Sequence, residues 1–170
     1  MNFIELAKKR YSVRQFDSKS VGRDVLEQVL EAGRVAPTAN NRQPQRVYIL
    51  QGEESMVKIK KCTQCHFNAP VVLLFLYDQT EAWVRPFDGM NFGAVDVSIV
   101  MTHMMLQAFD LGLGSTWVEF FEPDKISAEF NLPENLIPAG LLPLGYPKSG
   151  VEPALMHEKR KANSELVTWM

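Results

Sequence analysis

The segment from Val95 to Leu111 carries apolar side chains on nearly every side when it is placed on a helix. A helix that is apolar all round is buried, either in the core of a domain or in an interface between subunits. Gly112 and Gly114 follow it and predict its end. The other elements of the chain must therefore cover this helix on at least one side.

A second apolar segment is shorter and predicts a strand. The run from Pro70 to Tyr77 is continuously apolar and has the length of a strand, not of a membrane-spanning helix. Because a strand with one solvated face alternates apolar and polar residues, a continuous run indicates a strand buried on both faces.

The remaining elements mix helices and strands without strict alternation, which favours an α+β fold over a doubly wound parallel sheet. With 170 residues and no repeat or linker, we expect a single domain over residues 1–170. The polar tail from Lys148 to Met170 would be more stable packed on a partner. Periodicity predicts helices over the first residues to Lys9 and over 24–35, 53–61 and 123–130, and strands over 47–50, 115–121 and 139–144.

Charge and cysteine content exclude several classes of protein. The net charge of -2 gives no electrostatic reason to expect nucleic acid or a membrane as a partner. Two cysteines cannot form a disulfide framework, and the N-terminus lacks the pattern of a signal peptide. We therefore expect a cytoplasmic protein.

The first candidate site is the segment Arg10-Tyr11-Ser12-Val13-Arg14. Alternate side chains of an extended segment point the same way, so Arg10, Ser12 and Arg14 would share one face. Two guanidinium groups beside a hydroxyl suit a phosphate or a carboxylate. The alternative is a solvated basic loop.

The second candidate site is the segment from Ala36 to Pro44, in which amides and a hydroxyl lie between two prolines. Amide side chains both donate and accept hydrogen bonds, which suits the edge of a heteroaromatic ring or a ribityl chain. The alternative is a turn stabilised by its own Asn side chains. Asp96, in the apolar helix, is expected to be a cap or a buried hydrogen-bond partner and not a base.

Six segments in order resemble the nitroreductase family. Each motif is weak alone, but together they extend over nearly the whole chain. The segments are Arg10-Tyr11-Ser12-Val13-Arg14-Gln15-Phe16, Ala36-Pro37-Thr38-Ala39-Asn40-Asn41-Arg42-Gln43-Pro44, Ala69-Pro70, Leu111-Gly112-Leu113-Gly114-Ser115-Thr116-Trp117, Leu144-Gly145-Tyr146-Pro147, and His157-Glu158-Lys159-Arg160-Lys161 with Glu165-Leu166-Val167.

The resemblance implies a three-layer α+β fold, with a mostly antiparallel sheet flanked by helices. It also implies a homodimer with an exchanged C-terminal arm and two non-covalent FMN sites at the interface. The activity would be ping-pong hydride transfer from NAD(P)H to a small electron-poor acceptor, such as a nitroaromatic or a quinone. No catalytic side chain is expected, because the flavin performs the chemistry.

The resemblance also assigns residues by position. Arg10, Ser12 and Arg14 would hold the FMN phosphate and ring edge, with a backbone contact from Tyr11 and a second phosphate-side cation from Arg160. Pro37, Thr38 and Ala39 would come from the other subunit and pack on the ring, with Asn41 and Gln43 shaping their loop. Glu119 and Phe120 would offer a backbone N–H to the flavin N5, where family members often have glycine at one of the two positions.

Two alternatives remain from the sequence. A protein with these motifs could bind flavin without turning over a substrate. The other alternative is an electron-transfer protein, because Cys62-Thr63-Gln64-Cys65-His66 matches the attachment pattern of c-type haem. A second Cys or His pair at zinc-ligand spacing is missing, so we expect no metal site.

Overall fold

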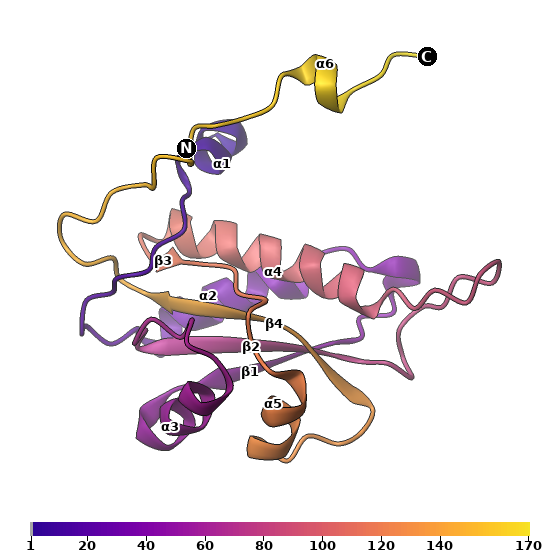
Figure 1. Ribbon diagram of the computed structural model, residues 1–170, viewed down its shortest axis with the longest axis horizontal. Helices are drawn as coiled ribbons and strands as arrows, with labels where there is room; N and C mark the ends of the chain where they lie inside the picture. Colours follow the sequence, from indigo (N-terminus) through magenta and orange to yellow (C-terminus); the bar gives the residue numbers. More distant parts are fainter. Residues whose placement is uncertain (1) are drawn as a thin grey trace.

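A four-stranded antiparallel sheet forms the centre of the computed structural model, which describes residues 2–170 (Figure 1). Strand β2 lies inside the sheet and pairs with both β1 and β4. Its apolar run is buried on both faces, as the sequence predicts, because helices cover both sides. The strands are β1 (Gln45–Leu50), β2 (Val71–Asp78), β3 (Gly114–Ser115) and β4 (Leu136–Gly145), in the order β1-β2-β4-β3.

Helices lie on both faces of the sheet and give the three layers seen in Figure 1. Helices α2 (Arg23–Arg34) and α4 (Gly93–Asp110) pack together on one face, and α1 (Phe3–Lys9) contacts α4. Helices α3 (Gly52–Cys62) and α5 (Pro123–Glu129) cover the other face. The structure confirms the predicted α+β class. A short 3₁₀ turn, η1 (Ala39–Asn41), and a short tail helix, α6 (Asn163–Leu166), complete the elements.

Two apolar clusters, one on each side of the sheet, form the core. Alternate residues of β2 divide between them: Leu73 and Phe75 pack toward α2 and α4, whereas Leu74 and Leu76 pack toward α3 and α5. All four side chains are fully buried. Burying a large apolar side chain contributes about 1.5–3 kcal/mol, so β2 anchors both layers.

Within residues 2–170, helix α4 is covered in part, by the sheet, by α2 and by α1. Val97, Val100 and Met101 are buried against the sheet. On the other side, Val95 is 39% exposed and His103 is exposed. Of the two environments that the sequence allows for this helix, the core accounts for the buried face, and the face with Val95 and His103 is exposed.

The predicted strand over 115–121 is wrong in extent, since β3 ends at Ser115. Thr116 continues alongside β4 through its N–H to the carbonyl of Pro143, at 3.3 Å. Proline has no N–H to return the second bond, so the ladder is interrupted there. One further bridge joins Val118 to Leu141.

Strand β4 is longer than the predicted strand over 139–144. It begins at Leu136 and contains Pro138 and Gly140, residues that local sequence reasoning treats as strand breakers. A shift in register between Phe75 and Leu76 of β2 accommodates this irregular part. The bulge thus permits residues that a regular interior strand would exclude.

The C-terminal tail crosses the N-terminal segment before it leaves the body (Figure 1). Tyr11 donates its hydroxyl to the Val151 carbonyl at 3.1 Å, and the His157 ring lies 2.9 Å from the Lys8 carbonyl. Beyond α6, Trp169 is 95% exposed. No helix within residues 2–170 has the length and apolar character needed to cross a membrane.

Candidate functional site

The Arg10–Arg14 segment is extended, as predicted, and lies against the edge strand β3. The Val13 N–H donates to the Ser115 carbonyl at 2.9 Å, and Ser12 forms a parallel bridge with Ser115. Val13 is 1% exposed and fills the space above Gly114, where an added Cβ would lie 2.6 Å from a Val13 methyl group. This packing fixes the backbone that carries the two arginines.

Three arginines at this edge lack an anionic partner. Arg10, Arg14 and Arg160 form no ion pair with a carboxylate anywhere in residues 2–170. Among residues 2–170, the Arg14 side chain donates a hydrogen bond only to the Ser12 carbonyl, at 3.4 Å, and Arg160 donates to backbone carbonyls of its own tail.

Arg10 is the most constrained of the three. Its Nε atom is buried and has no hydrogen-bond partner among the described residues. Burial, and secondly the positive charge of Arg160, lowers the pKa of Arg10. A buried donor beside a like charge is unfavourable unless an anion neutralises it. The chemistry of this donor set therefore fits a phosphate group. Of the three arginines, Arg160 lines a cavity of about 280 Å³, together with Lys8, His157 and Glu158.

Free backbone donors lie further along the chain from β3. The N–H groups of Glu119 and Phe120 donate no hydrogen bond in the described part of the chain. They line a cavity of about 530 Å³ with the end of α3. The Phe120 carbonyl accepts the Thr63 hydroxyl, and Phe120 does not have a positive φ. A side chain at this position therefore does not strain the backbone where family members often have glycine.

The segment from Pro37 to Gln43 is held in an unusual backbone conformation. Asn40, Asn41 and Gln43 all have a φ near 50°. The Gln43 N–H donates to the Thr38 hydroxyl at 3.0 Å, and the Gln43 side chain donates to the Asn41 carbonyl at 3.2 Å. Asp96 accepts from the Ala39 N–H at 2.8 Å, so it is the buried hydrogen-bond partner that the sequence suggests.

Within one chain the two candidate segments are far apart. Segment 37–43 leads into Gln45, which pairs with Tyr77 near the end of β2. Strand β3 instead pairs with Leu144 and Gly145, beside Val71 at the start of β2. Eight residues of strand separate the two ends by about 23 Å. The structure places Pro37–Gln43 near the end of β2, where β1 begins. It brings the other predicted site residues to the edge of the sheet formed by β3: Arg10, Ser12, Arg14, Glu119, Phe120 and Arg160.

Lys8 and His157 are neighbours of the arginine cluster that sequence reasoning did not assign. Lys8 belongs to the last turn of α1, and His157 begins the motif that contains Arg160. Their positions follow from the tail crossing the N-terminal segment. The resemblance of residues 157–161 to the family's end was the only sequence feature that could have suggested it.

Cys62 and His66 of the Cys62-Cys65-His66 motif form hydrogen bonds with neighbouring backbone groups. Cys62 is 2% exposed and donates its thiol to the Lys58 carbonyl, and burial raises its pKa. The His66 Nδ1 accepts from the Asn68 N–H at 3.0 Å. Within residues 2–170 no group of three or more His, Cys, Asp or Glu side chains is arranged to hold a metal ion.

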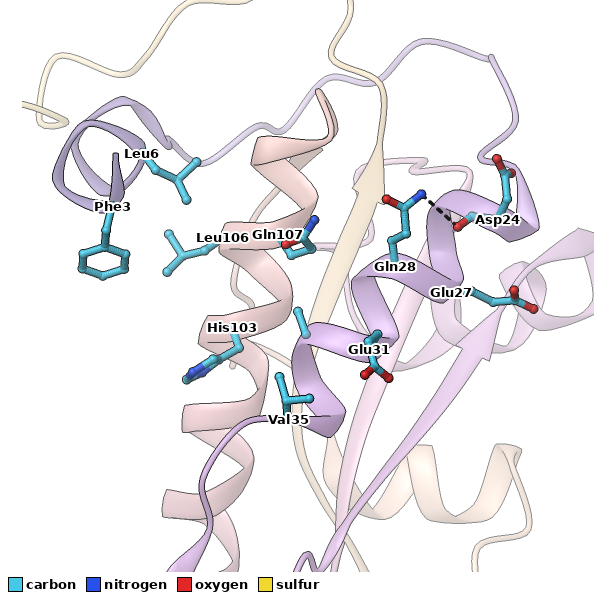
Figure 2. Close-up of a pocket in the computed structure, with 11 residues that line it drawn as sticks. Phe3, Leu6, Asp24, Glu27, Gln28, Glu31, Val35, His103, Leu106 and Gln107 are labelled. Carbon is cyan, nitrogen blue, oxygen red and sulfur yellow. Dashed lines mark hydrogen bonds between the residues drawn. The ribbon is translucent and has the colours of Figure 1, made fainter. Parts of the chain in front are cut away.

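An apolar groove of about 840 Å³ lies between α1, α2 and α4 (Figure 2). Phe3 and Leu6 of α1 face Leu106 of α4 across it. Its α2 side carries the carboxylates of Asp24, Glu27 and Glu31. The groove is thus apolar with an acidic rim.

This chain is similar in sequence and in structure to proteins of the nitroreductase family. A family model described as the nitroreductase family matches residues 7–68 and 57–146. A crystal structure of a nitroreductase family protein from Clostridium difficile 630 is 45% identical, with a TM-score of 0.93, and the match covers 99% of this chain and 98% of that one. An NADH dehydrogenase from Thermus thermophilus is 27% identical over 83% of this chain and 84% of its own length. An FMN reductase [NAD(P)H] from Bacillus subtilis is 28% identical over 86% and 67% respectively.

Proposed function

Because the chain belongs to the nitroreductase family, we propose that it is a cytoplasmic FMN-dependent NAD(P)H oxidoreductase for small electron-poor acceptors such as nitroaromatics and quinones. The observation that supports this most is the set of three arginines without a carboxylate partner in residues 2–170, on the same edge of the sheet as the free backbone amides of Glu119 and Phe120. A cofactor with a phosphate at one end and an electron-accepting ring at the other matches both features.

The chain's own residues bind and orient the cofactor. Arg10, Arg14 and Arg160 would neutralise the nearly two negative charges of the FMN phosphate. The N–H groups of Glu119 and Phe120 would donate toward N5 and stabilise the electron-rich ring without a titrating side chain. When bound, FMN would supply the hydride chemistry between NAD(P)H and the acceptor, for which a ping-pong cycle is expected.

A homodimer with the cofactor sites at its interface would unite the two separated segments. Pro37, Thr38 and Ala39 of one subunit would pack on the ring held by the arginines of the other. The separation of about 23 Å along β2 supports this arrangement, since one chain cannot place both segments on one ring. The open face of α4 supports it too, because a second subunit would cover that face.

The exchanged C-terminal arm fits the same dimer. Leu166 and Trp169 are 64% and 95% exposed, although both are apolar. The tail that carries them also contains Lys159 and Lys161, and the groove in Figure 2 has an apolar floor and an acidic rim. Replacing Leu166 and Trp169 together with serine should weaken the dimer, which light scattering after gel filtration measures. A variant as fully dimeric as the wild type at low micromolar concentration would argue against the arm exchange.

An absorption spectrum of the purified protein, followed by an activity assay, tests the cofactor and the reaction. Bands near roughly 370 and 450 nm, released as FMN on denaturation, are expected for a flavoprotein. Oxidation of NAD(P)H that depends on added quinone would then establish the activity. Bound FMN without oxidation would indicate a flavin-binding protein. A Soret band that survives denaturation would favour haem on Cys62 and Cys65 and refute the proposal.

A further inference from the structure

The conformation of segment 37–43 is costly for the residues that adopt it. Asn40, Asn41 and Gln43 have φ values of 50°, 53° and 50°, in the left-handed region. Asparagine tolerates this region because its short side chain bonds locally, but glutamine has no such advantage. Residues held in this region are destabilising unless the surrounding structure imposes the conformation.

One hydrogen bond connects this segment to a distant part of the chain. Most of its bonds are local, such as that from the Gln43 N–H to the Thr38 hydroxyl. Among the described residues, the bond from the Ala39 N–H to Asp96 Oδ1, at 2.8 Å, is the only one that joins residues 37–43 to an element beyond residue 46. Asp96 lies in the first turn of α4, which the core fixes through Val97 and Val100.

Burying the Asp96 carboxylate at this position is energetically unfavourable. It is 1% exposed, and its second carboxylate oxygen is buried without a hydrogen-bond partner in residues 2–170. The start of α4 and the Ala39 N–H offset part of the cost of burying the charge. An apolar side chain at such a site is often as stable or more stable. What the carboxylate adds is therefore a charge-assisted anchor for the Ala39 amide.

We infer that Asp96 is a positioning residue, which holds Pro37–Gln43 in the conformation that binds the cofactor. The inference rests on the proposed function, in which this segment packs on FMN across the dimer interface. Asp96 does not contact the cofactor; it acts by accepting the hydrogen bond from the Ala39 N–H.

Three variants of the full-length protein test the inference. Asp96→Ala removes the acceptor, whereas Asp96→Asn keeps an oxygen that can accept from the Ala39 N–H. Asp78→Ala is the matched control, because Asp78 is also a buried carboxylate near this end of the sheet. Its side chain bonds to Thr80 and Asn135 and not to segment 37–43, and its backbone N–H donates to the Pro44 carbonyl at 2.8 Å, a bond that the substitution keeps.

Hydrogen exchange of residues 36–44 is measured on the FMN-free protein, and the dissociation constant of FMN is measured by fluorescence titration. Asp96→Ala should speed the exchange and weaken FMN binding by about tenfold each, as expected for the loss of a hydrogen bond to a charged group. Asp96→Asn should stay within about threefold of the wild type. Asp78→Ala should lower the melting temperature but leave both quantities unchanged.

Unchanged exchange and FMN affinity in Asp96→Ala would overturn the inference. Equal effects of Asp96→Ala and Asp78→Ala would also overturn it, since they would reflect a general loss of stability. A wild-type protein that binds no FMN would refute the proposed function instead, and the exchange comparison would still decide whether Asp96 holds the segment.

Discussion

Replacing Arg10 with methionine should have opposite effects on cofactor affinity and on the stability of the empty protein. Methionine keeps the apolar length of the side chain but removes the charge and the buried, unpartnered Nε. A hydrogen bond between a guanidinium and a phosphate contributes about 1.5–3 kcal/mol. The FMN dissociation constant should therefore rise roughly 10- to 150-fold, since about 1.4 kcal/mol corresponds to a factor of ten.

Without FMN, the same substitution removes an unpaired buried donor and its repulsion from Arg160, which together lower the pKa of Arg10. The melting temperature of the FMN-free variant should therefore be unchanged or higher, by about 2–4 °C for each kcal/mol gained. Fluorescence titration measures the affinity, and thermal unfolding of the stripped protein measures the stability.

Arg23→Met is the matched control, because Arg23 is a surface residue paired with Glu27 and should affect neither quantity by much. If Arg10→Met lowers the melting temperature by several degrees and leaves FMN affinity unchanged, Arg10 is a structural residue and the reasoning fails.

Three further predictions concern packing, thiol reactivity and pH. Gly93→Ala should destabilise the protein by about 1–3 kcal/mol, measured by thermal unfolding, because the new Cβ would lie 2.1 Å from the Tyr77 ring; an unchanged melting temperature would show that the ring is free to move. Iodoacetamide at pH 8 should label Cys65 before Cys62, since Cys62 is buried and burial raises its pKa; equal labelling rates by mass spectrometry would contradict this. Hydrogen bonding from Thr80 holds the pKa of Asp78 below its usual value, so the stability from this carboxylate is present above about pH 4 and is lost as the pH falls through the lower folded value. The melting temperature of Asp78→Asn should accordingly fall less steeply with acid than that of the wild type, and parallel curves would exclude the contribution.

Local sequence patterns predict those elements whose apolar composition alone requires burial. The apolar run in β2 and the apolar helix α4 are both found within two residues of the predicted bounds. Their apolar composition requires burial wherever they lie, so no long-range information is needed. The irregular edge was not predictable in the same way. Strand β3 stops because Pro143, from another strand, lies opposite Thr116, and only the register reveals this neighbour.

The candidate site was predictable as two segments, and only the family resemblance assigned those segments to different subunits. The Arg10–Arg14 motif and the 36–44 motif are both readable from residue types, and the family resemblance links them. Their separation by the length of β2 follows from the register of β1 and β4 on β2 and of β3 on β4. The approach of Arg160 to Arg10 likewise depends on the tail crossing the N-terminal segment. Residue types therefore indicated the ligand, while the distance between the two segments within one chain becomes visible only in the structure.

The most direct test of this account is subunit complementation. Arg10→Glu would disable the arginine side of the site and Ala39→Glu the loop side, so neither variant alone should bind FMN tightly. If each site takes its two sides from different chains, co-expression of the two variants should restore one intact site in every mixed dimer, with about one FMN for two chains. Mixed dimers that bind no more FMN than either parent variant would contradict the account, because both sides would then belong to the same chain.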